Sequence, residues 1–342
     1  IYRLQQRELF TMRQLEPMTR DGKFITLHAN IELPQEAEKV QDFGATGIGL
    51  YRSEFLFFGS SLPTRQEQCE AYKHILNSLA PNPVTIRTLD SGGDKLVSEL
   101  SLSNEANPFM GWRSIRVCLD REELFKDQLK ALLQANEKGN LRILLPMISG
   151  LPELRKSKEY IKTCLAELAE EGIECPSVEI GIMIEVPAAV MQVEQLAKEA
   201  DFFSIGTNDL IQFTLAVDRS NEMIADMFQP HHPAILNMIY NTVIAAHKEG
   251  IPVAVCGEMS ADPFSILLLI GLGVDELSMT PWSIMEAKKI IRSINYEDVN
   301  EIALRTLRFD DAASVDSFLH QRFAQAFADL GITSYVPAQK IN

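Results

Sequence analysis

Short, nearly continuous runs of apolar residues recur along the chain, and amphipathic stretches separate them. Parallel strands have this composition when both of their faces are covered. The apolar runs predict eight strands, at residues 25–31, 47–53, 84–90, 141–147, 179–185, 202–208, 253–256 and 276–280. Among the amphipathic stretches, the helical pattern predicts helices at residues 151–171, 187–200, 236–247 and 263–272.

Strand and helix in alternation indicate right-handed βαβ units and a parallel sheet. Eight such units close a (β/α)8 barrel, whereas an open, doubly wound sheet is favoured if one predicted strand is false. We therefore predict an α/β fold, a single (β/α)8 TIM barrel at residues 21–309. A leading helix or linker at residues 1–20 precedes it, and a C-terminal helix and tail at residues 310–342 follow. Two connections, at residues 55–67 and 91–121, exceed ordinary loop lengths and are expected to be functional or mobile.

The formal charge of −15 on 342 residues disfavours non-specific binding to nucleic acids and to anionic membranes. No apolar run reaches the roughly 20 residues needed to span a bilayer. The five cysteines are odd in number and form no CxxC pair, which favours reduced thiols and a cytoplasmic protein. The sequence begins at Ile1 and not at Met, so we expect a fragment of a longer protein.

Polar residues gather where the predicted strands end. They are, in chain order, Arg52, Arg87, Asp90, Glu185, Asn208, Asp209 and Cys256. Solvation alone explains a charge at the end of any single strand, but in a barrel this end of the strands carries the chemistry. The sequence therefore predicts that these side chains converge on one site.

The residue types indicate the chemistry of such a site. Paired carboxylates, here Glu185 and Asp209, suit Mg2+ or Mn2+. Arginine forks match phosphate oxygens, and a metal together with arginines is typical of phosphoryl transfer. Cys256 has no evident histidine base that would make it a nucleophile. Its unperturbed pKa of about 8.5 suits proton donation to an enolate.

Other signals are weaker. A metal site at His231 and His232 is disfavoured, and residues 54–58 read as packing. Residues 92–95 are either a simple turn or a turn that approaches phosphate, and Asp218-Arg219 reads as a surface ion pair without further context.

Six segments together carry a family resemblance. They are residues 49–57, 87–95, 107–113, 181–188, 202–219 and 256–258, and the stretch FFSIGTNDLIQFTLAVDR is the most specific. On these segments the chain resembles the C-terminal, phosphoenolpyruvate-binding region of enzyme I of the bacterial sugar phosphotransferase system. Enzyme I is a phosphoenolpyruvate-protein phosphotransferase, and the same region occurs in fused multiphosphoryl transfer proteins.

The resemblance implies a (β/α)8 barrel and roles for eight residues. It assigns Mg2+ to Glu185 and Asp209, and makes Cys256 the acid that protonates C3 of the enolate to give pyruvate. It places the substrate phosphoenolpyruvate at Arg52, Arg87, Arg113, Asn208 and Arg219.

The resemblance also implies partners. None of the six histidines lies in the Gly-, Thr- or Ser-rich context of the family's phosphohistidine. The expected partners are therefore an N-terminal phosphohistidine domain and, through it, the phosphocarrier protein, in a homodimer that serves sugar uptake. Three alternatives stay open: a non-catalytic dimerisation and ligand-sensing module, a domain of the pyruvate phosphate dikinase or phosphoenolpyruvate synthase type, and a lyase or aldolase acting on a pyruvate enolate.

Overall fold

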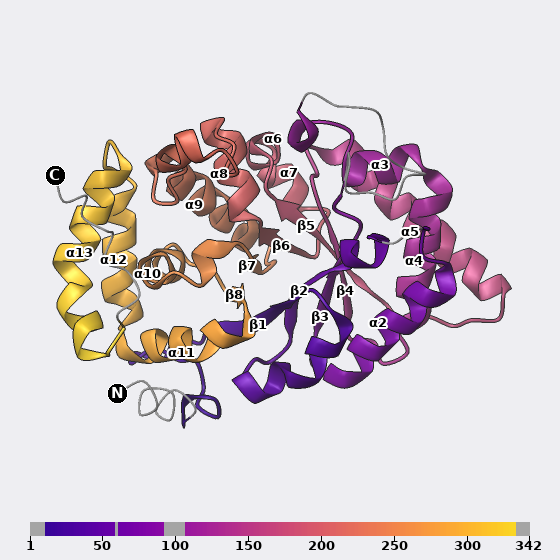
Figure 1. The fold of residues 1–342 in the computed structure, drawn as a ribbon, viewed down its shortest axis with the longest axis horizontal. Coiled ribbons are helices and arrows are strands. Elements are labelled where there is room, and N and C mark those ends of the chain that lie inside the picture. Colours follow the sequence, from indigo (N-terminus) through magenta and orange to yellow (C-terminus); the bar gives the residue numbers. More distant parts are fainter. Residues whose placement is uncertain (1–10, 59–60, 92–106, 333–342) are drawn as a thin grey trace.

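Eight parallel strands close into a barrel in the computed structural model, which describes residues 11–58, 61–91 and 107–332 (Figure 1). The strands follow one another around the barrel in chain order, and β1 closes the ring by pairing with β8, Thr26 opposite Glu276 and Ala29 opposite Met279. They are β1 (Thr26–Ile31), β2 (Ile48–Arg52), β3 (Val84–Arg87), β4 (Leu141–Leu145), β5 (Glu179–Ile184), β6 (Phe202–Ile205), β7 (Val253–Val255) and β8 (Glu276–Met279). All eight predicted strands and the closed barrel are confirmed, and the open sheet is excluded.

Helices surround the barrel and cover the outer faces of its strands (Figure 1). The α-helices are α2 (Arg65–Leu79), α3 (Ile115–Asp120), α4 (Glu122–Ala135), α5 (Leu151–Glu170), α6 (Pro187–Met191), α7 (Val193–Ala197), α8 (Thr207–Leu215), α9 (Pro233–Lys248), α10 (Pro263–Gly271), α11 (Ile284–Ser293), α12 (Tyr296–Thr306) and α13 (Ala312–Asp329). Short 3-10 helices are η1 (Pro34–Phe43), η2 (Ser53–Phe57), η4 (Pro108–Met110), η5 (Glu222–Met227), η6 (Glu258–Ser260) and η7 (Pro281–Ser283). No helix in the described part of the chain is long and apolar enough to cross a membrane.

A buried ionic cluster lies at the amino ends of the strands. Arg142 of β4 reaches Glu276 of β8 at 3.1 Å, and its guanidinium stacks 4.0 Å from the centre of the Phe202 ring. His28 lies 3.5 Å from the same carboxylate. Although burial alone would raise it, these two partners lower the pKa of Glu276 to about 2. The cluster therefore holds four strands together at the end of the barrel opposite to the polar strand ends.

Three predicted elements need correction. The predicted sixth strand ends at Ile205, because α8 begins at Thr207; Asn208 and Asp209 therefore lie in the first turn of a helix. The predicted helix at residues 187–200 divides at Gln192 into α6 and α7. The long connection at 91–121 contains η4 and α3, and residues 92–95 lie outside the described residues.

The structure also tests the helices predicted at the two ends of the chain. The first half of the predicted leading helix, residues 1–10, lies outside the described residues. Its second half is a helical turn at residues 11–12 followed by irregular chain, and Met18 pairs with Phe24 in an isolated antiparallel bridge, so the helix does not extend to residue 20. The predicted C-terminal helix is confirmed as α13.

Candidate active site

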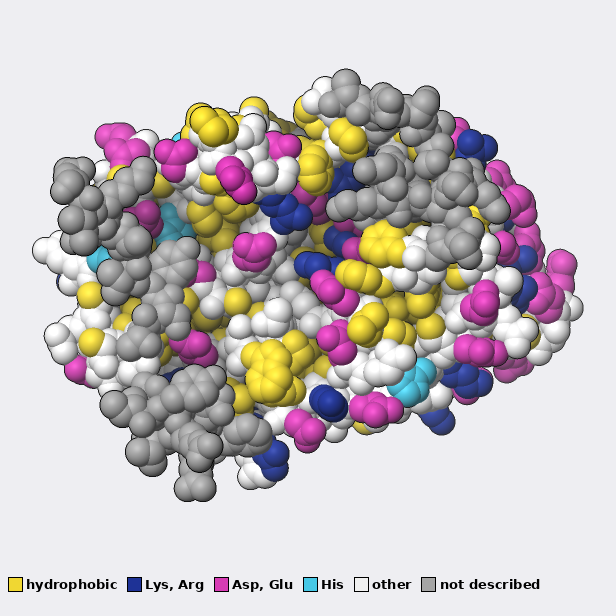
Figure 2. Space-filling view, viewed as in Figure 1, with side chains coloured by type: hydrophobic (Ala, Val, Ile, Leu, Met, Phe, Trp, Pro, Cys, Tyr) yellow, Lys and Arg dark blue, Asp and Glu magenta, His cyan; other side chains and the backbone are white. Residues whose placement is uncertain are grey.

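A cavity of about 400 Å3 opens at the carboxyl ends of the strands. Acidic and basic side chains lie side by side near the middle of this face (Figure 2). The structure brings all eight residues named from the sequence into the lining of this cavity: Arg52, Arg87, Arg113, Glu185, Asn208, Asp209, Arg219 and Cys256. Four arginines and four carboxylates line it, so the cavity is close to neutral in a strongly acidic chain.

Arg87, the last residue of β3, is held from two sides by buried carboxylates. Its Nη1 lies 2.7 Å from Oδ2 of Asp90, and its Nη2 donates to Glu54. Burial alone would lower the pKa of this guanidinium, but Asp90 and Glu54 more than offset the burial and raise it. A planar guanidinium with two fixed neighbours presents one defined edge to the cavity.

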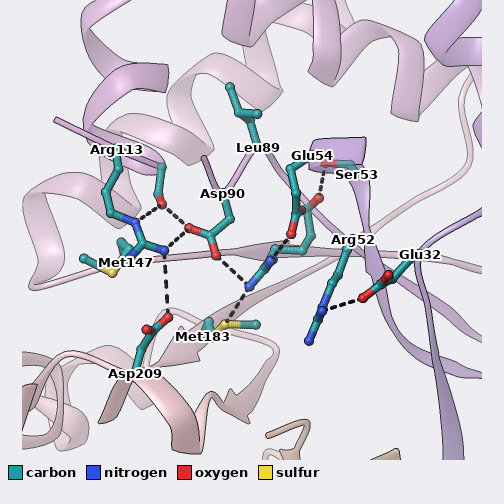
Figure 3. Close-up of polar contacts among 12 residues, drawn as sticks. Glu32, Arg52, Ser53, Glu54, Leu89, Asp90, Arg113, Met147, Met183 and Asp209 are labelled. Atoms are coloured by element: carbon teal, nitrogen blue, oxygen red, sulfur yellow. Dashed lines mark hydrogen bonds and ion pairs between the residues drawn. The ribbon is translucent and has the colours of Figure 1, made fainter. Parts of the chain in front are cut away.

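Asp90 also orients a second arginine (Figure 3). Its Oδ1 accepts a hydrogen bond of 2.9 Å from Nη2 of Arg113 and another from the hydroxyl of Ser114. The same Nη2 lies 3.8 Å from Oδ2 of Asp209. Burial alone would raise the pKa of Asp90, but Arg87 and Arg113 hold it well below its usual range. Asp90 is therefore an anion that joins two arginines into one rigid unit.

Glu185 and Asp209 form the carboxylate pair expected from the sequence. Glu185 directly follows β5 and is buried, and its Oε1 accepts a hydrogen bond of 2.6 Å from the backbone N–H of Met147. Met147 adopts φ of 56°, in the left-handed region that side chains other than glycine rarely occupy, and this local strain occurs where the N–H meets the carboxylate. Burial, followed by the charge of Asp209, raises the pKa of Glu185 well above its ordinary value.

The donor atoms of this pair fit a hard divalent cation. A buried carboxylate next to a second carboxylate is unfavourable unless a positive charge joins them. Mg2+ binds through one or two carboxylates and completes its shell with water and substrate phosphate oxygens. Within the described ranges no group of three or more His, Cys, Asp or Glu side chains could hold a metal ion. Two carboxylates are a ligand set of the size that Mg2+ uses in proteins.

The other predicted residues differ in how firmly they are held. Arg52 ends β2, and its Nη1 lies 2.6 Å from Oε1 of Glu32 while its side chain is 38% exposed. Arg219 is exposed at the rim of the cavity. Asn208 is engaged with the backbone and side chain of Glu258, donating to Oε1 at 3.0 Å and accepting from N–H at 3.1 Å. Arg52 and Arg219 are thus freer to reorganise around a ligand than Arg87 and Arg113.

Cys256 directly follows β7 and is 5% exposed. Its thiol lies 3.7 Å from the carbonyl oxygen of Ile205, to which it donates. Burial raises the pKa of this thiol, and Ser204 and Arg87 offset part of the increase. Cys256 therefore carries its proton at neutral pH, as an acid must before it donates.

Residues missed in the sequence analysis are the acidic partners of the arginines. Glu54 was assigned to a packing segment, yet it is buried against Arg87. The sequence places Asp90 at a strand end but indicates no role for it, and it does not indicate that Glu258 contacts Asn208. The signal that was available was a charge inside an apolar segment, since Glu54 sits among aromatic residues and needs a partner when buried.

His231 contacts Asp316 at 2.5 Å and Ser265 at 2.8 Å.

Fold and site together define a parallel (β/α)8 barrel with an arginine- and carboxylate-lined cavity at the carboxyl ends of its strands. Residues 6–296 match the family model described as "PEP-utilising enzyme, PEP-binding domain". The chain belongs to this family.

The chain is also similar to curated proteins. It is 44% identical over 327 residues to the phosphoenolpyruvate-protein phosphotransferase of Geobacillus stearothermophilus, covering 95% of this chain and 57% of that protein. It is 43% identical over 316 residues to the phosphoenolpyruvate-protein phosphotransferase of Haemophilus influenzae, covering 92% and 55%. The chain thus spans little more than half the length of these relatives. Among solved structures, a citrate lyase from Burkholderia xenovorans LB400 aligns with 91% of this chain and 96% of its own at 15% identity and a TM-score of 0.48.

Proposed function

We propose that this chain is the phosphoenolpyruvate-binding, Mg2+-dependent part of a phosphoenolpyruvate-protein phosphotransferase. The observation that carries the proposal is the convergence of four arginines, the carboxylates of Glu185 and Asp209 and the thiol of Cys256 on a single cavity. Family membership and relatives that bear this name over 95% of the chain support it.

The geometry suggests separate tasks for the arginines. Arg87 and Arg113 are buried and fixed by Asp90, so they present donors to the substrate phosphate without losing side-chain entropy on binding. Arg52 and Arg219, at the more exposed side, would close on the phosphate from solvent. Mg2+ held by Glu185 and Asp209 would neutralise charge on the phosphate and enolate oxygens.

The reaction has two linked steps. The P–O bond of phosphoenolpyruvate breaks as a histidine of a separate domain accepts the phosphoryl group, which leaves the enolate of pyruvate. C3 of that enolate then takes the proton from Sγ of Cys256, giving pyruvate and a thiolate. Arg87 lies near enough to lower the pKa of the thiol and stabilises the thiolate that results.

The partners are part of the proposal. The family resemblance implies a phosphohistidine domain N-terminal to this chain, and the whole protein would have room for it, because this chain spans only 57% of the length of the first relatives. Through that domain the protein would phosphorylate the phosphocarrier protein of a sugar uptake system, in the cytoplasm and as a homodimer.

The first test is calorimetric titration of phosphoenolpyruvate into the chain with and without Mg2+. Binding should require Mg2+. Asp209→Ala should bind phosphoenolpyruvate equally weakly with and without Mg2+, because one of the two metal ligands is lost. Arg155→Ala, at a surface ion pair with Glu199, is the matched control. Metal-independent binding by the unaltered chain would refute the Mg2+ assignment.

A second test examines Cys256 without the missing domain. By microscopic reversibility, the thiolate should remove a proton from the methyl group of pyruvate, so that deuterium from D2O enters that group in the presence of Mg2+. The exchange should accelerate as pH rises towards the raised pKa of the thiol, since abstraction needs the thiolate. Cys256→Ser should lower the exchange rate by at least about 100-fold, the loss expected for a general acid or base. Exchange at the unaltered rate in this variant would remove Cys256 from the mechanism.

A further inference from the structure

The segment that carries Cys256 receives little support from the sheet. The strand before it, β7, has only three residues, and it pairs with β8 through Ala254 and Val255 alone. The backbone N–H of Cys256 donates to Ile205 of β6 at 3.2 Å. The ladders of β7 with β6 and with β8 both end at Val255, so the carbonyl of Cys256 has no partner within them. A buried backbone carbonyl without a hydrogen-bond donor lowers the stability of the folded protein, so a donor from elsewhere is expected.

Asn30 of β1 supplies that donor. Its Nδ2 donates to the carbonyl of Cys256 at 3.0 Å and to that of Ser278 at 3.2 Å. Ser278 is a residue of β8, the strand between β1 and β7, and its hydroxyl donates back to Oδ1 of Asn30. One amide therefore ties β1 to β8 and to the end of β7. Gly49 leaves the room for this contact, because a Cβ there would lie 2.3 Å from the Ser278 hydroxyl.

We propose that Asn30 is a positioning residue for Cys256, a role that rests on the proposed function of the cavity. By holding the carbonyl of Cys256, the Asn30 amide fixes the backbone from which the thiol projects, and so the direction in which the proton is delivered. Proton transfer needs the two heavy atoms within hydrogen-bond reach, so a displacement of about 1 Å is costly. Asn30 needs no contact with substrate for this.

The test uses deuterium exchange into pyruvate by the purified chain. Asn30→Ala should lower the exchange rate at saturating pyruvate by at least about tenfold, with little change in KM, because geometry and not binding is disturbed. Ser278→Ala leaves both donors of Asn30 but removes the bond that orients them, so a smaller loss is expected. This milder variant decides the question if Asn30→Ala does not fold. The matched control is Asn300→Ala, which removes an amide-to-carbonyl bond of 2.8 Å to Gly271 outside the cavity.

A second readout does not depend on the function of the cavity. Alkylation by iodoacetamide, followed at each cysteine by peptide mass spectrometry, reports how firmly the Cys256 segment is held. In Asn30→Ala the rate at Cys256 should rise at least about threefold, while the rate at Cys69 stays unchanged. If both readouts match those of Asn300→Ala, the positioning role is refuted. If the unaltered chain exchanges no deuterium, the proposed function fails, and the alkylation rate alone decides whether Asn30 holds Cys256.

Discussion

Replacing Glu185 by Gln should stabilise the metal-free protein while removing its response to Mg2+. Glu185 is 1% exposed and lies beside Asp209, and burial together with that neighbouring charge raises its pKa. The hydrogen bond from Met147 survives the change, because Oε1 of a glutamine accepts it equally well. The substitution therefore removes a charge and leaves the shape and the hydrogen bond in place.

The size of the effect follows from Coulomb's law. In general, two unit charges about 4 Å apart interact by about 4 kcal/mol at an effective dielectric constant of about 20. Arg87 and Arg113 offset part of this repulsion at Glu185. We expect Glu185→Gln to raise the free energy of unfolding by about 1–2 kcal/mol at pH 7.

The direction of the pKa shift of Glu185 determines how the stability gain of Glu185→Gln changes with pH. A carboxyl group whose pKa is raised in the folded state costs stability once the unfolded chain ionises, above about pH 4.3. The advantage of Glu185→Gln should therefore shrink as pH falls towards that value and be greatest above the raised pKa. Urea unfolding at several pH values, with and without Mg2+, measures both effects. A variant less stable than the unaltered chain without metal, or equally stabilised by Mg2+, would show that the reasoning is wrong.

Two further predictions concern the arginines and the glycine next to Cys256. Arg87→Ala and Arg52→Ala should each weaken phosphoenolpyruvate binding more than about tenfold in calorimetry. Only Arg87→Ala should also lower the free energy of unfolding, by about 3–5 kcal/mol, because it leaves two buried carboxylates without their partner. Arg52→Ala removes only one half-exposed ion pair. Equal losses of stability in the two variants would contradict this. Gly257→Ala should cost about 1–3 kcal/mol in urea unfolding, because its Cβ would lie 1.9 Å from the hydroxyl of Thr207. Gly150→Ala, whose Cβ would meet only the end of a glutamine side chain at 3.3 Å, should cost much less, and similar losses at both glycines would refute the steric argument.

The barrel could be predicted because each strand is recognisable from the apolar residues of its own segment. Runs such as residues 143–145 and 180–184 are apolar throughout, and buried parallel strands demand this regardless of what lies elsewhere. The error at residues 202–208 has the same origin. The apolar pattern ends at Ile205, but Gly206 to Asn208 are compatible with either a strand end or the first turn of a helix. In the fold, Asn208 contacts Glu258, a residue 50 positions away, and a local pattern contains no information about such a contact.

The site was harder to predict than the fold, because its arginines and carboxylates act on one another. Strand ends point to Arg87 and Glu185 directly, since these residues follow apolar runs. Arg113 lies in a long connection, and only its resemblance to a known family marked it out. Its orientation depends on Asp90, at 2.9 Å in space but 23 residues away in the sequence. A spacing of this kind follows from no helical or strand period.

The acidic residues around the arginines explain how a cavity that binds an anion can be built in a chain of charge −15. Arg87 and Arg113 are buried, and unpaired guanidinium groups there would cost several kcal/mol each. Asp90 and Glu54 remove that cost in the free protein, and they also fix which donors face the cavity. The same pairing leaves the cavity near neutrality, so under the proposed function its affinity for a trianionic substrate would depend on a bound cation. A cation held by Glu185 and Asp209 would relieve their mutual repulsion, and metal and substrate binding would then be cooperative.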